Sequence, residues 1–387
     1  MPAMHESSID LAIKDYQDGK YKTLSKAAVV YGLHPSTVYR RIKNQRSRRE
    51  VQVSRQILTP AQEDWIARVI QSLQGIYAAI SGDTVLDIAA CMTQSRPGRK
   101  WLNYFYRRQP GLSRTDTRQR DAFSRAPTVE FAIVGLIDEL QARCEQYKVP
   151  PRDLYDMNEI GFAHGQPRSD SLVFDKRGQN ISCGNPIVDA SSWIYTMECS
   201  SADGSLLDPM IVSYGRDSNQ EPISEDVRVA HARWHFTITS EGWTDHEMAL
   251  RWLQECFLPQ AAARRRGDYI ILILDNHPSH YTGKFIYHCY TNQVIPIYMP
   301  LRCQYSLQPL DVGPFSTLRQ KYTRYLARNT TGTESARLVR AYAEARRALF
   351  TKDAIRTGWR QCGIYPFDRG QILAHPITTE TAHEPIR

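Results

Sequence analysis

The sequence predicts a multidomain protein in which an all-α N-terminal region precedes an α/β domain. Helical patterns with recognisable caps run from about residue 7 to residue 118, and strand-like apolar runs alternate with helical ones from about residue 152. A chain of 387 residues also exceeds the usual size of one domain. The net charge also differs between the N-terminal third and the rest of the chain. Residues 1–125 hold 21 Lys and Arg against 11 Asp and Glu, a net of +10, whereas residues 126–387 hold 28 against 30, a net of −2.

The basic N-terminal third is typical of an arm that binds nucleic acid. The alternative is a basic surface that only keeps the protein soluble. No apolar run reaches the roughly 18 residues of a membrane span, and Glu6 and Asp10 do not suit a secretory signal. The eight cysteines form no C-x-x-C pair, which favours reduced thiols in an intracellular protein over a zinc or disulfide framework. Composition therefore predicts a nucleic-acid partner and no membrane association, and the helix-turn-helix patterns described next indicate double-stranded DNA.

Residues 7–45 are expected to form three short helices. Ser25 is placed to cap the second helix, and Gly32 can end it because glycine adopts the left-handed conformation readily. Pro35 suits the first turn of the third helix, which is expected to run to about residue 44. A helix, a tight glycine turn and a second helix form the helix-turn-helix pattern.

The third helix carries the candidate DNA-reading residues. Val38 and Ile42 are four positions apart and can face the core, which leaves the other side for a DNA groove. That side carries Ser36, Arg40, Lys43 and Asn44. The alternative is an ordinary amphipathic helix with a solvated basic face, but the turn chemistry and the charge favour groove recognition.

A polar, basic linker follows at residues 46–56 and is expected to follow the DNA backbone. Its candidate phosphate contacts are Arg46, Arg48 and Arg49. The same cluster is compatible with a nuclear-import signal, a weak pattern that nevertheless agrees with a nuclear protein.

A second helical unit is expected at about residues 57–118. Thr59 can cap its first helix, and Pro60 suits the first helical position. Apolar stripes at residues 65–70 and 101–106 are expected to form core, the alternative being aromatic groups that stack on bases. The candidate phosphate contacts interleaved with the second stripe are Arg99, Lys100, Arg107 and Arg108.

The α/β part is expected to follow a connecting helix at residues 129–147. Strands are expected at 154–160, 193–200, 207–214, 269–275 and 294–299, with a hairpin turn at Ala202, Asp203 and Gly204. Helices are expected at 244–257, capped by Thr244, and at 281–291 and 314–326.

Two carboxylates, Asp275 and Asp311, are expected at the ends of strands or of the segments that connect strands. Asp275 ends an apolar run and precedes the polar turn Asn-His-Pro-Ser-His at 276–280, and Asp311 closes the sequence Leu-Gln-Pro-Leu-Asp at 307–311. Carboxylates brought together across a sheet make a divalent-metal site for phosphodiester chemistry. A third is expected on the strand at 154–160, where the corresponding position holds Asn158.

These motifs resemble the acidic motifs of pogo-type transposases in the mariner superfamily. Asp-Asn-His-Pro-Ser-His at 275–280 and Leu-Gln-Pro-Leu-Asp-Val-Gly at 307–313 are similar to the second and third motifs, and further landmarks match at 201–204, 242–245 and 362–367. The helix-turn-helix units also resemble those of centromere protein B. The resemblance spans roughly residues 8–368 and implies an RNase H-like domain with an Asp-Asp-Asp site for Mg²⁺ or Mn²⁺.

The first motif departs from the family. The family pattern resembles Asn-x-Asp-Glu-x-Gly-Phe, whereas this chain reads Asp-Met-Asn-Glu-Ile-Gly-Phe at 156–162. Asn158 supplies no charge, Asp156 lies about 6.6 Å along the strand, and Glu159 faces the other side. The loop at 302–305 also lacks the histidine usual in the family. Neither His277 nor His280 is a metal ligand in this resemblance; His277 either positions a phosphate or stabilises its turn.

The resemblance and the departures predict a transposon-derived, sequence-specific DNA-binding protein whose DDE endonuclease domain is degenerate at Asn158. Asp275 and Asp311 remain as catalytic and metal-binding candidates. The alternatives are activity through a shifted carboxylate, a different alignment of the first motif, a pure DNA-binding scaffold that can dimerise, and a nuclease without transposition. The predicted domains are a helix-turn-helix at 1–50, a second one at 51–120, a connecting helix at 121–150, an RNase H-like domain at 151–330, a helical extension at 331–368 and a disordered tail at 369–387.

Overall fold

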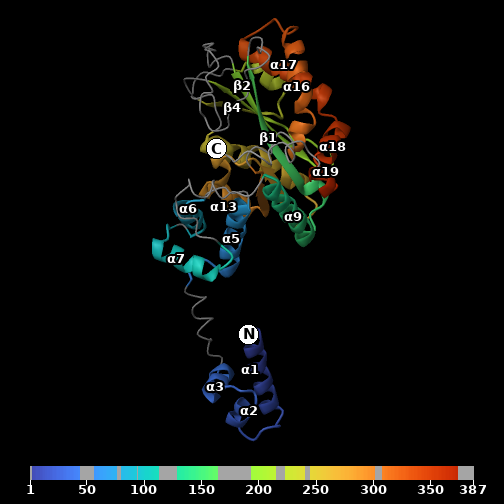
Figure 1. The fold of residues 1–387 in the computed structure, drawn as a ribbon. Coiled ribbons are helices and arrows are strands. Elements are labelled where there is room, and N and C mark those ends of the chain that lie inside the picture. Colours follow the sequence, from blue (N-terminus) through green and yellow to red (C-terminus); the bar gives the residue numbers. More distant parts are fainter. Residues whose placement is uncertain are drawn as a thin grey trace. The chain divides into compact units, whose positions relative to one another are not determined.

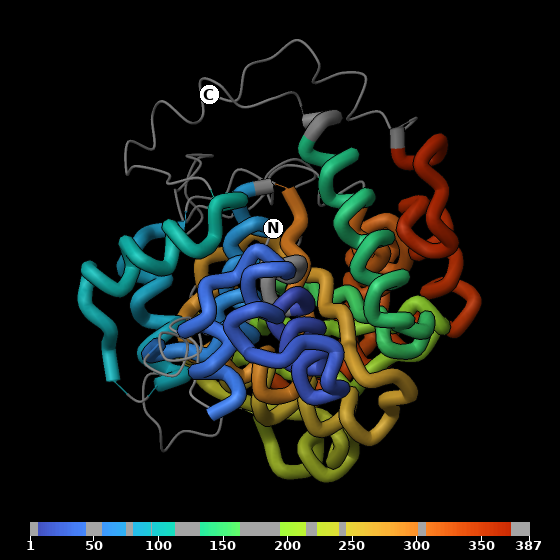
Figure 2. The backbone as a smooth tube through the Cα atoms, turned by 90° about the horizontal axis from the view of Figure 1, so that it is seen from below, coloured from blue at the N-terminus to red at the C-terminus, as the bar shows by residue number. Residues whose placement is uncertain are grey.

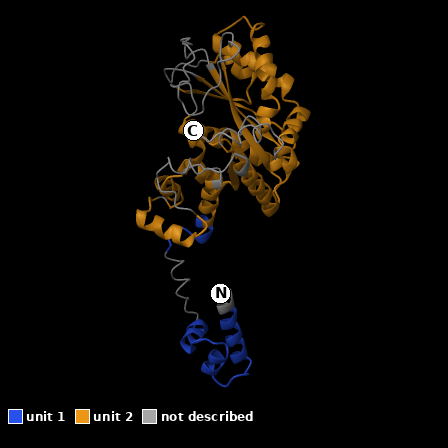
Figure 3. Ribbon diagram, viewed as in Figure 1, with its two compact units in different colours: residues 1–63 blue, residues 64–387 orange. Residues whose placement is uncertain are grey.

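A computed structural model describes residues 2–43, 56–75, 80–93, 95–112, 129–163, 193–214, 223–239, 245–300 and 307–373. The predicted DNA contacts Asn44, Arg46, Arg48 and Arg49, the loop at 302–305 and the end of the predicted tail lie outside these residues. The chain divides into two compact units, residues 1–63 and residues 64–387 (Figure 3).

The first unit contains the three predicted N-terminal helices, α1 (Pro2–Gln17), α2 (Leu24–Val30) and α3 (Pro35–Ile42). The prediction of Ser25 as the cap of α2 is wrong, because Thr23 is the N-cap and its hydroxyl accepts the Lys26 N–H. Gly32 has a φ of 68° and follows α2 as predicted. Pro35 occupies the first turn of α3, where a missing N–H costs nothing.

Apolar side chains from all three helices make a small core: Ile9, Ala12, Ala28, Leu33 and Val38. Because this core uses one face of α3, the opposite face of that helix is exposed. Ile42, which was predicted to join Val38 in the core, is 38% exposed.

Three further helices follow: α5 (Pro60–Gly75), α6 (Gly82–Thr93) and α7 (Arg99–Arg108). A capping box begins α5, since Thr59 Oγ1 accepts the Gln62 N–H and Gln62 Oε1 accepts the Thr59 N–H. Helix α6 packs closely on α13 (Gly283–Thr291). A Cβ at Gly283 would lie 2.7 Å from the Asp87 carbonyl carbon, so only glycine allows this approach.

The α/β part is built on a six-stranded mixed sheet with the order β4-β3-β2-β1-β5-β6 (Figure 1). Its strands are β1 (Leu154–Ala163), β2 (Trp193–Ser201), β3 (Met210–Tyr214), β4 (His235–Thr239), β5 (Ile270–Leu274) and β6 (Val294–Tyr298). Strand β1 is antiparallel to β2 and parallel to β5, so it lies where the hairpin half meets the parallel half. The predicted hairpin turn is present, with Gly204 at a φ of 87°.

Helices cover both faces of this sheet. Leu154 and Ile160 of β1 belong to cores shared with α9 (Val129–Tyr147), α16 (Phe315–Leu326) and α17 (Glu334–Leu349). Tyr155 points the other way and meets Phe257 edge-on, with ring centroids 5.4 Å apart. That second layer contains α11 (His246–Arg251), the π-helical segment η3 (Trp252–Phe257), α12 (Leu258–Arg264) and α13.

Several predictions about this region need correction. Strand β4 was not predicted, and a short helix, α10 (Glu225–Ala230), precedes it. Asp245, not Thr244, caps α11, because its carboxylate accepts the Met248 N–H at 2.8 Å. Residues 369–373, expected in a disordered tail, form the short helix α19 (Arg369–Leu373), whose Ile372 is fully buried.

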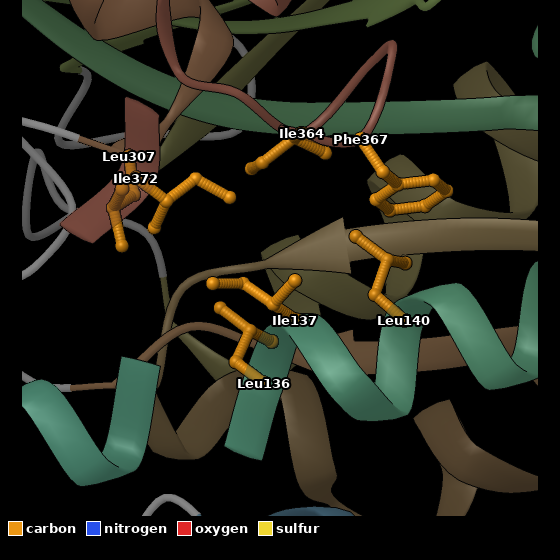
Figure 4. A pocket seen from close by; sticks show the side chains of 7 residues that line it. All are labelled: Leu136, Ile137, Leu140, Leu307, Ile364, Phe367 and Ile372. Carbon is orange, nitrogen blue, oxygen red and sulfur yellow. The ribbon is translucent and has the colours of Figure 1, made fainter. Parts of the chain in front are cut away.

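The C-terminal helices pack against the segment that carries the motif at 307–313. Figure 4 shows Leu307 at a small pocket that it lines together with apolar side chains of α9 and of the C-terminal segment: Leu136, Ile137, Leu140, Ile364, Phe367 and Ile372. Helix α18 (Lys352–Gln361) approaches α15 (Pro309–Val312) closely. A Cβ at Gly358 would overlap the Pro309 carbonyl oxygen, so a glycine pair, Gly313 and Gly358, permits this contact. Figure 2 shows these C-terminal helices beside α9 in a view along the molecule.

Candidate functional site

The centre of β1 carries the two residues that depart from the family motif. Asp156 and Asn158 lie on the same face of β1 because side chains alternate along a strand. Both are buried, at 0% and 3% exposure. In the β1–β5 ladder Asp156 pairs with Ile273, which is the last pair of that ladder. The predicted first carboxylate position therefore lies on β1, and the second directly follows the end of its parallel neighbour β5 at Leu274.

Asp156 anchors the third motif to β1. Its Oδ2 accepts a hydrogen bond from the Leu310 N–H at 3.1 Å. Beside it, Gln308 Nε2 donates to the Met157 carbonyl oxygen at 2.6 Å. These two bonds join residues more than 150 positions apart in the sequence, and they hold the segment that carries Asp311 against the strand. Asp156 thus has a structural role that an aspartate at position 158 would not duplicate.

The amide of Asn158 is oriented by the backbone beside it. Its Oδ1 accepts the Glu159 N–H at 2.8 Å. The opposite orientation would set the amide NH₂ against that N–H, two donors facing each other, so the assignment is fixed by the hydrogen bond. Nδ2 is buried and has no hydrogen-bond partner among the described residues. Position 158 therefore presents an N–H donor where the family resemblance requires an oxygen ligand.

Glu198 of β2 is the cross-strand neighbour of Asn158. It is fully buried, and Arg346 of α17 binds both of its oxygens, with Nε 2.6 Å from Oε1 and Nη2 3.0 Å from Oε2. The Tyr342 hydroxyl donates to the same Oε1. Although burial opposes its charge, the Glu198 carboxylate raises the pKa of Arg346 further above its usual range. Glu198 is therefore an internally neutralised carboxylate.

Asp275 is paired with a buried histidine. His280 Nδ1 lies 2.7 Å from Asp275 Oδ1, and its Nε2 lies 3.9 Å from Glu159 Oε1. Burial alone would lower the pKa of His280, but the two carboxylates outweigh burial and raise that pKa above its ordinary value. The Asp275 side chain is consequently held by a histidine from its own turn.

His277 stabilises its turn. It is the N-cap of the 3₁₀ turn η4 (Pro278–Tyr281), and its Nδ1 accepts the Ser279 N–H at 3.4 Å. Of the two roles considered for His277, this contact supports turn stabilisation.

Asp311 lies on α15, half-buried, on the side of the sheet where Cys362 is buried. Burial raises the pKa of the Cys362 thiol well above its ordinary value, and the Asp156 and Asp311 carboxylates raise it further. The structure therefore brings Asp156 and Asp311 to one neighbourhood around the Cys-Gly-Ile-Tyr-Pro-Phe sequence at 362–367. The use of Asp275 and Asp311 as metal ligands stays a prediction from the resemblance.

A divalent cation is the cofactor that the resemblance implies, and the residues do not fit one well. Asn158 turns a donor inward, Asp275 is paired with His280, and Asp156 accepts from the Leu310 N–H. Over the ranges that the structure describes, no group of three His, Cys, Asp or Glu side chains is arranged to hold a metal ion. Mg²⁺ needs oxygen ligands in near-octahedral geometry, which these side chains do not offer together.

Three of the predicted DNA-reading residues lie together on the exposed face of α3 and its C-cap. Ser36, Arg40 and Lys43 are all exposed. Tyr39, which the sequence reasoning did not select, is 53% exposed on the same face, with Lys43 Nζ 4.7 Å from its ring centroid. Its spacing of three from Ser36 and four from Lys43 could have identified it.

The candidate contacts on α7 are also exposed, but they are not equivalent. Arg99 Nη2 lies 2.9 Å from Asp83 Oδ2 and is thus engaged within the protein. Lys100, Arg107 and Arg108 are exposed, and the Arg107 guanidinium lies 5.7 Å from the ring centroid of the exposed Tyr104. The apolar residues Trp101, Leu102 and Phe105 are buried, which confirms their prediction as core.

Residues 190–359 match the family model described as DDE superfamily endonuclease. The matched range contains Asp275 and Asp311 and begins after Asn158. A curated relative, named MFS-type transporter clz9, from Cochliobolus lunatus, is 24% identical over 366 residues. The match covers 91% of this chain and 35% of the relative, so the chain spans about a third of that protein's length.

Among solved structures, the chain is similar to two complexes of Mos1. The strand transfer complex is 11% identical with a TM-score of 0.38, covering 94% of this chain and 97% of that chain. The mariner Mos1 paired end complex with Mg is 12% identical with a TM-score of 0.39, covering 98% of each chain. None of the described helices is both long and apolar enough to span a membrane.

Proposed function

We propose that this chain is a transposon-derived DNA-binding protein of the nucleus, with a pogo-like, RNase H-like domain whose catalysis is impaired by Asn158. The observation that carries the proposal is the Asn158 amide, whose Oδ1 accepts the Glu159 N–H and whose Nδ2 is buried with no hydrogen-bond partner among the described residues. The DDE superfamily match over 190–359 supports the ancestry of the domain. The ancestral reaction would be metal-dependent cleavage and transfer of transposon ends.

DNA binding is supported by the exposed basic faces of α3 and α7 and by the excess charge of the N-terminal third. In α3 the apolar side is used by the small three-helix core, which leaves Ser36, Arg40 and Lys43 available to a groove. Lys100, Arg107 and Arg108 of α7 would add phosphate contacts, whereas Arg99 would first have to leave Asp83.

A second candidate is an endonuclease that uses Asp156 as a shifted first ligand. The observation in its favour is that Asp156 is bound to the segment that carries Asp311. Against it, Asp156 already accepts the Leu310 N–H and would have to exchange that bond for an ion.

Binding of the full chain to duplex DNA tests the proposal first. A preferred duplex would be selected from a randomised pool, and its affinity would be measured between about 50 and 200 mM salt, the range over which phosphate contacts weaken strongly. We expect the affinity to fall steeply with salt and to exceed that for a scrambled duplex. No binding at the low end, or binding that salt leaves unchanged, would sink the proposal.

A further inference from the structure

Helix α16 presents a cationic row that neither the site nor the N-terminal arm accounts for. Between Asp311 and Glu334 the sequence has four Lys or Arg and no acidic residue. The body of the protein is near neutral as a whole, so this segment is a local concentration of positive charge. It begins directly after the motif that carries Asp311.

The row follows from the way in which α16 is buried. Phe315, Leu318, Tyr322 and Leu326 pack into the core shared with α17, and the opposite side of α16 is left to solvent (Figure 1). Spacings of four, three and four set one line along that side: Thr317, Lys321, Arg324 and Arg328. We call these four residues the α16 row. Thr317, Arg324 and Arg328 are exposed, and Lys321 is half-buried.

Among the described residues, the cations of the α16 row have no acidic partners. Within the described part of the chain, Lys321, Arg324 and Arg328 make no salt bridge, and Arg328 only rests against Tyr325, 5.9 Å from its ring centroid. Neighbouring α17 is the internal comparison. There Arg337 donates to the Asn329 carbonyl, and Arg340 and Arg346 bind Asp226 and Glu198. An arginine that only stabilised the fold would be expected to bind a carboxylate or carbonyl group of the protein, as the arginines of α17 do.

We propose that the α16 row binds the phosphate backbone of duplex DNA, as a contact surface in the α/β domain that is separate from the N-terminal helices. Thr317 and Arg324 are seven helical residues apart, about 10 Å at 1.5 Å per residue, and Arg328 extends the row from the turn that follows Leu326. Duplex DNA carries a phosphate about every 3.4 Å along each strand, so a row of this length faces several. Hydroxyl, ammonium and guanidinium groups are the side-chain donors that contact phosphate oxygens.

This inference rests on the proposed DNA-binding function and assigns part of that binding to a new surface. Because the α16 row would contact phosphates and not base edges, it is expected to position DNA beside the Asp311 motif without sequence preference. An anionic membrane would satisfy the same charges, and the test separates it from DNA.

The test uses the full chain and the selected duplex, with affinity measured by fluorescence anisotropy across a salt series. The triple variant Lys321→Gln/Arg324→Gln/Arg328→Gln removes the three charges and keeps good helix formers. A matched triple variant, Arg266→Gln/Lys352→Gln/Arg360→Gln, removes three exposed charges elsewhere in the same unit. Circular dichroism would check that both fold, and Arg324→Lys/Arg328→Lys serves as a charge-retaining variant if the first triple does not.

We expect the α16 triple to lower the slope of log affinity against log salt by about 2 to 3, since each phosphate contact contributes roughly 0.9. The matched triple and the charge-retaining variant should keep the wild-type slope, and discrimination against scrambled DNA should not change. Wild-type binding that the α16 triple leaves intact overturns this inference alone. Absence of wild-type binding overturns it together with the proposed function. Binding of the α16 row to phosphatidylserine vesicles, with duplex affinity unchanged, overturns it in favour of a membrane surface.

Discussion

Asn158 lies directly opposite Glu198 across the β1–β2 ladder, so their side chains are neighbours on one face of the sheet. Glu198 is already neutralised by Arg346, which binds both of its oxygens. An aspartate at position 158 would therefore stand beside a compensated charge, and the surrounding core does not by itself forbid one. The proposed loss of a carboxylate at position 158 could therefore be reversed by the single substitution Asn158→Asp without leaving a second uncompensated charge beside it.

The buried Glu198–Arg346 pair should be important for stability. Arg346→Met leaves Glu198 charged and unpaired in the core and is expected to lower the free energy of unfolding by about 3–5 kcal/mol. The double variant Glu198→Gln/Arg346→Met removes both charges and should recover a large part of that loss. Denaturant unfolding of the three proteins measures both effects, and equal stability of the single and double variants would contradict the burial argument.

Asp156 is expected to act as an anchor for the third motif. Asp156→Ala leaves the buried Leu310 N–H without its acceptor and should destabilise the protein by about 1–3 kcal/mol. Asp156→Asn keeps an acceptor oxygen of similar shape and should cost less. Urea unfolding with hydrogen exchange at Leu310 checks the cause, because faster exchange should accompany the Ala variant only.

Arg40 of α3 is predicted to read bases, whereas Arg48 in the linker is predicted to contact the backbone. Arg40→Ala should cost about 1–3 kcal/mol on the preferred duplex and reduce discrimination against scrambled DNA. Arg48→Ala should weaken both duplexes alike. If Arg40→Ala leaves the preference unchanged, α3 is not the recognition helix.

Glu139 of α9 gives a pH-dependent prediction. Burial raises its pKa above the ordinary 4.5, against the opposing effects of Arg143 and Ser72. A carboxyl with a raised pKa in the folded state stabilises the protein fully below its unfolded pKa, and that contribution is lost as pH rises through the folded pKa. Glu139→Gln should therefore be more stable than wild type at pH 7, with the difference shrinking towards pH 4. Unfolding curves over this range, with Glu145→Gln as an exposed control on the same helix, measure the trend.

The elements around the site were largely predictable from sequence, because their signals are local. The apolar runs that became β5 and β6 are continuous, and the turn at Gly204 has a glycine where the backbone requires one. Strand β4 was missed since His235–Thr239 interrupts its apolar residues with polar ones and only two of its five positions are buried.

The contacts that define the site could not be read from the sequence. The Leu310 N–H reaches Asp156 across 154 positions, and Arg346 reaches Glu198 across 148. No spacing rule connects such residues, because tertiary packing alone brings them together. The departure at Asn158 was visible in the motif, but the direction of its amide depends on the Glu159 N–H, which only the fold positions.

A nicking assay in Mn²⁺ on the selected duplex tests the central claim, that the loss of the carboxylate at position 158 impairs this domain. The proteins are wild type, Asn158→Asp, the exchange Asp156→Asn/Asn158→Asp, Asn158→Asp/Asp275→Ala as the matched negative control, and the single variants Asp156→Ala and Asp275→Ala. We predict wild-type cleavage at the level of a reaction without protein, a measurable rise for Asn158→Asp or the exchange, and loss of that rise with Asp275→Ala. Robust wild-type cleavage that is abolished by Asp275→Ala and by Asp156→Ala would contradict the account, because Asp156 would then be the working first ligand.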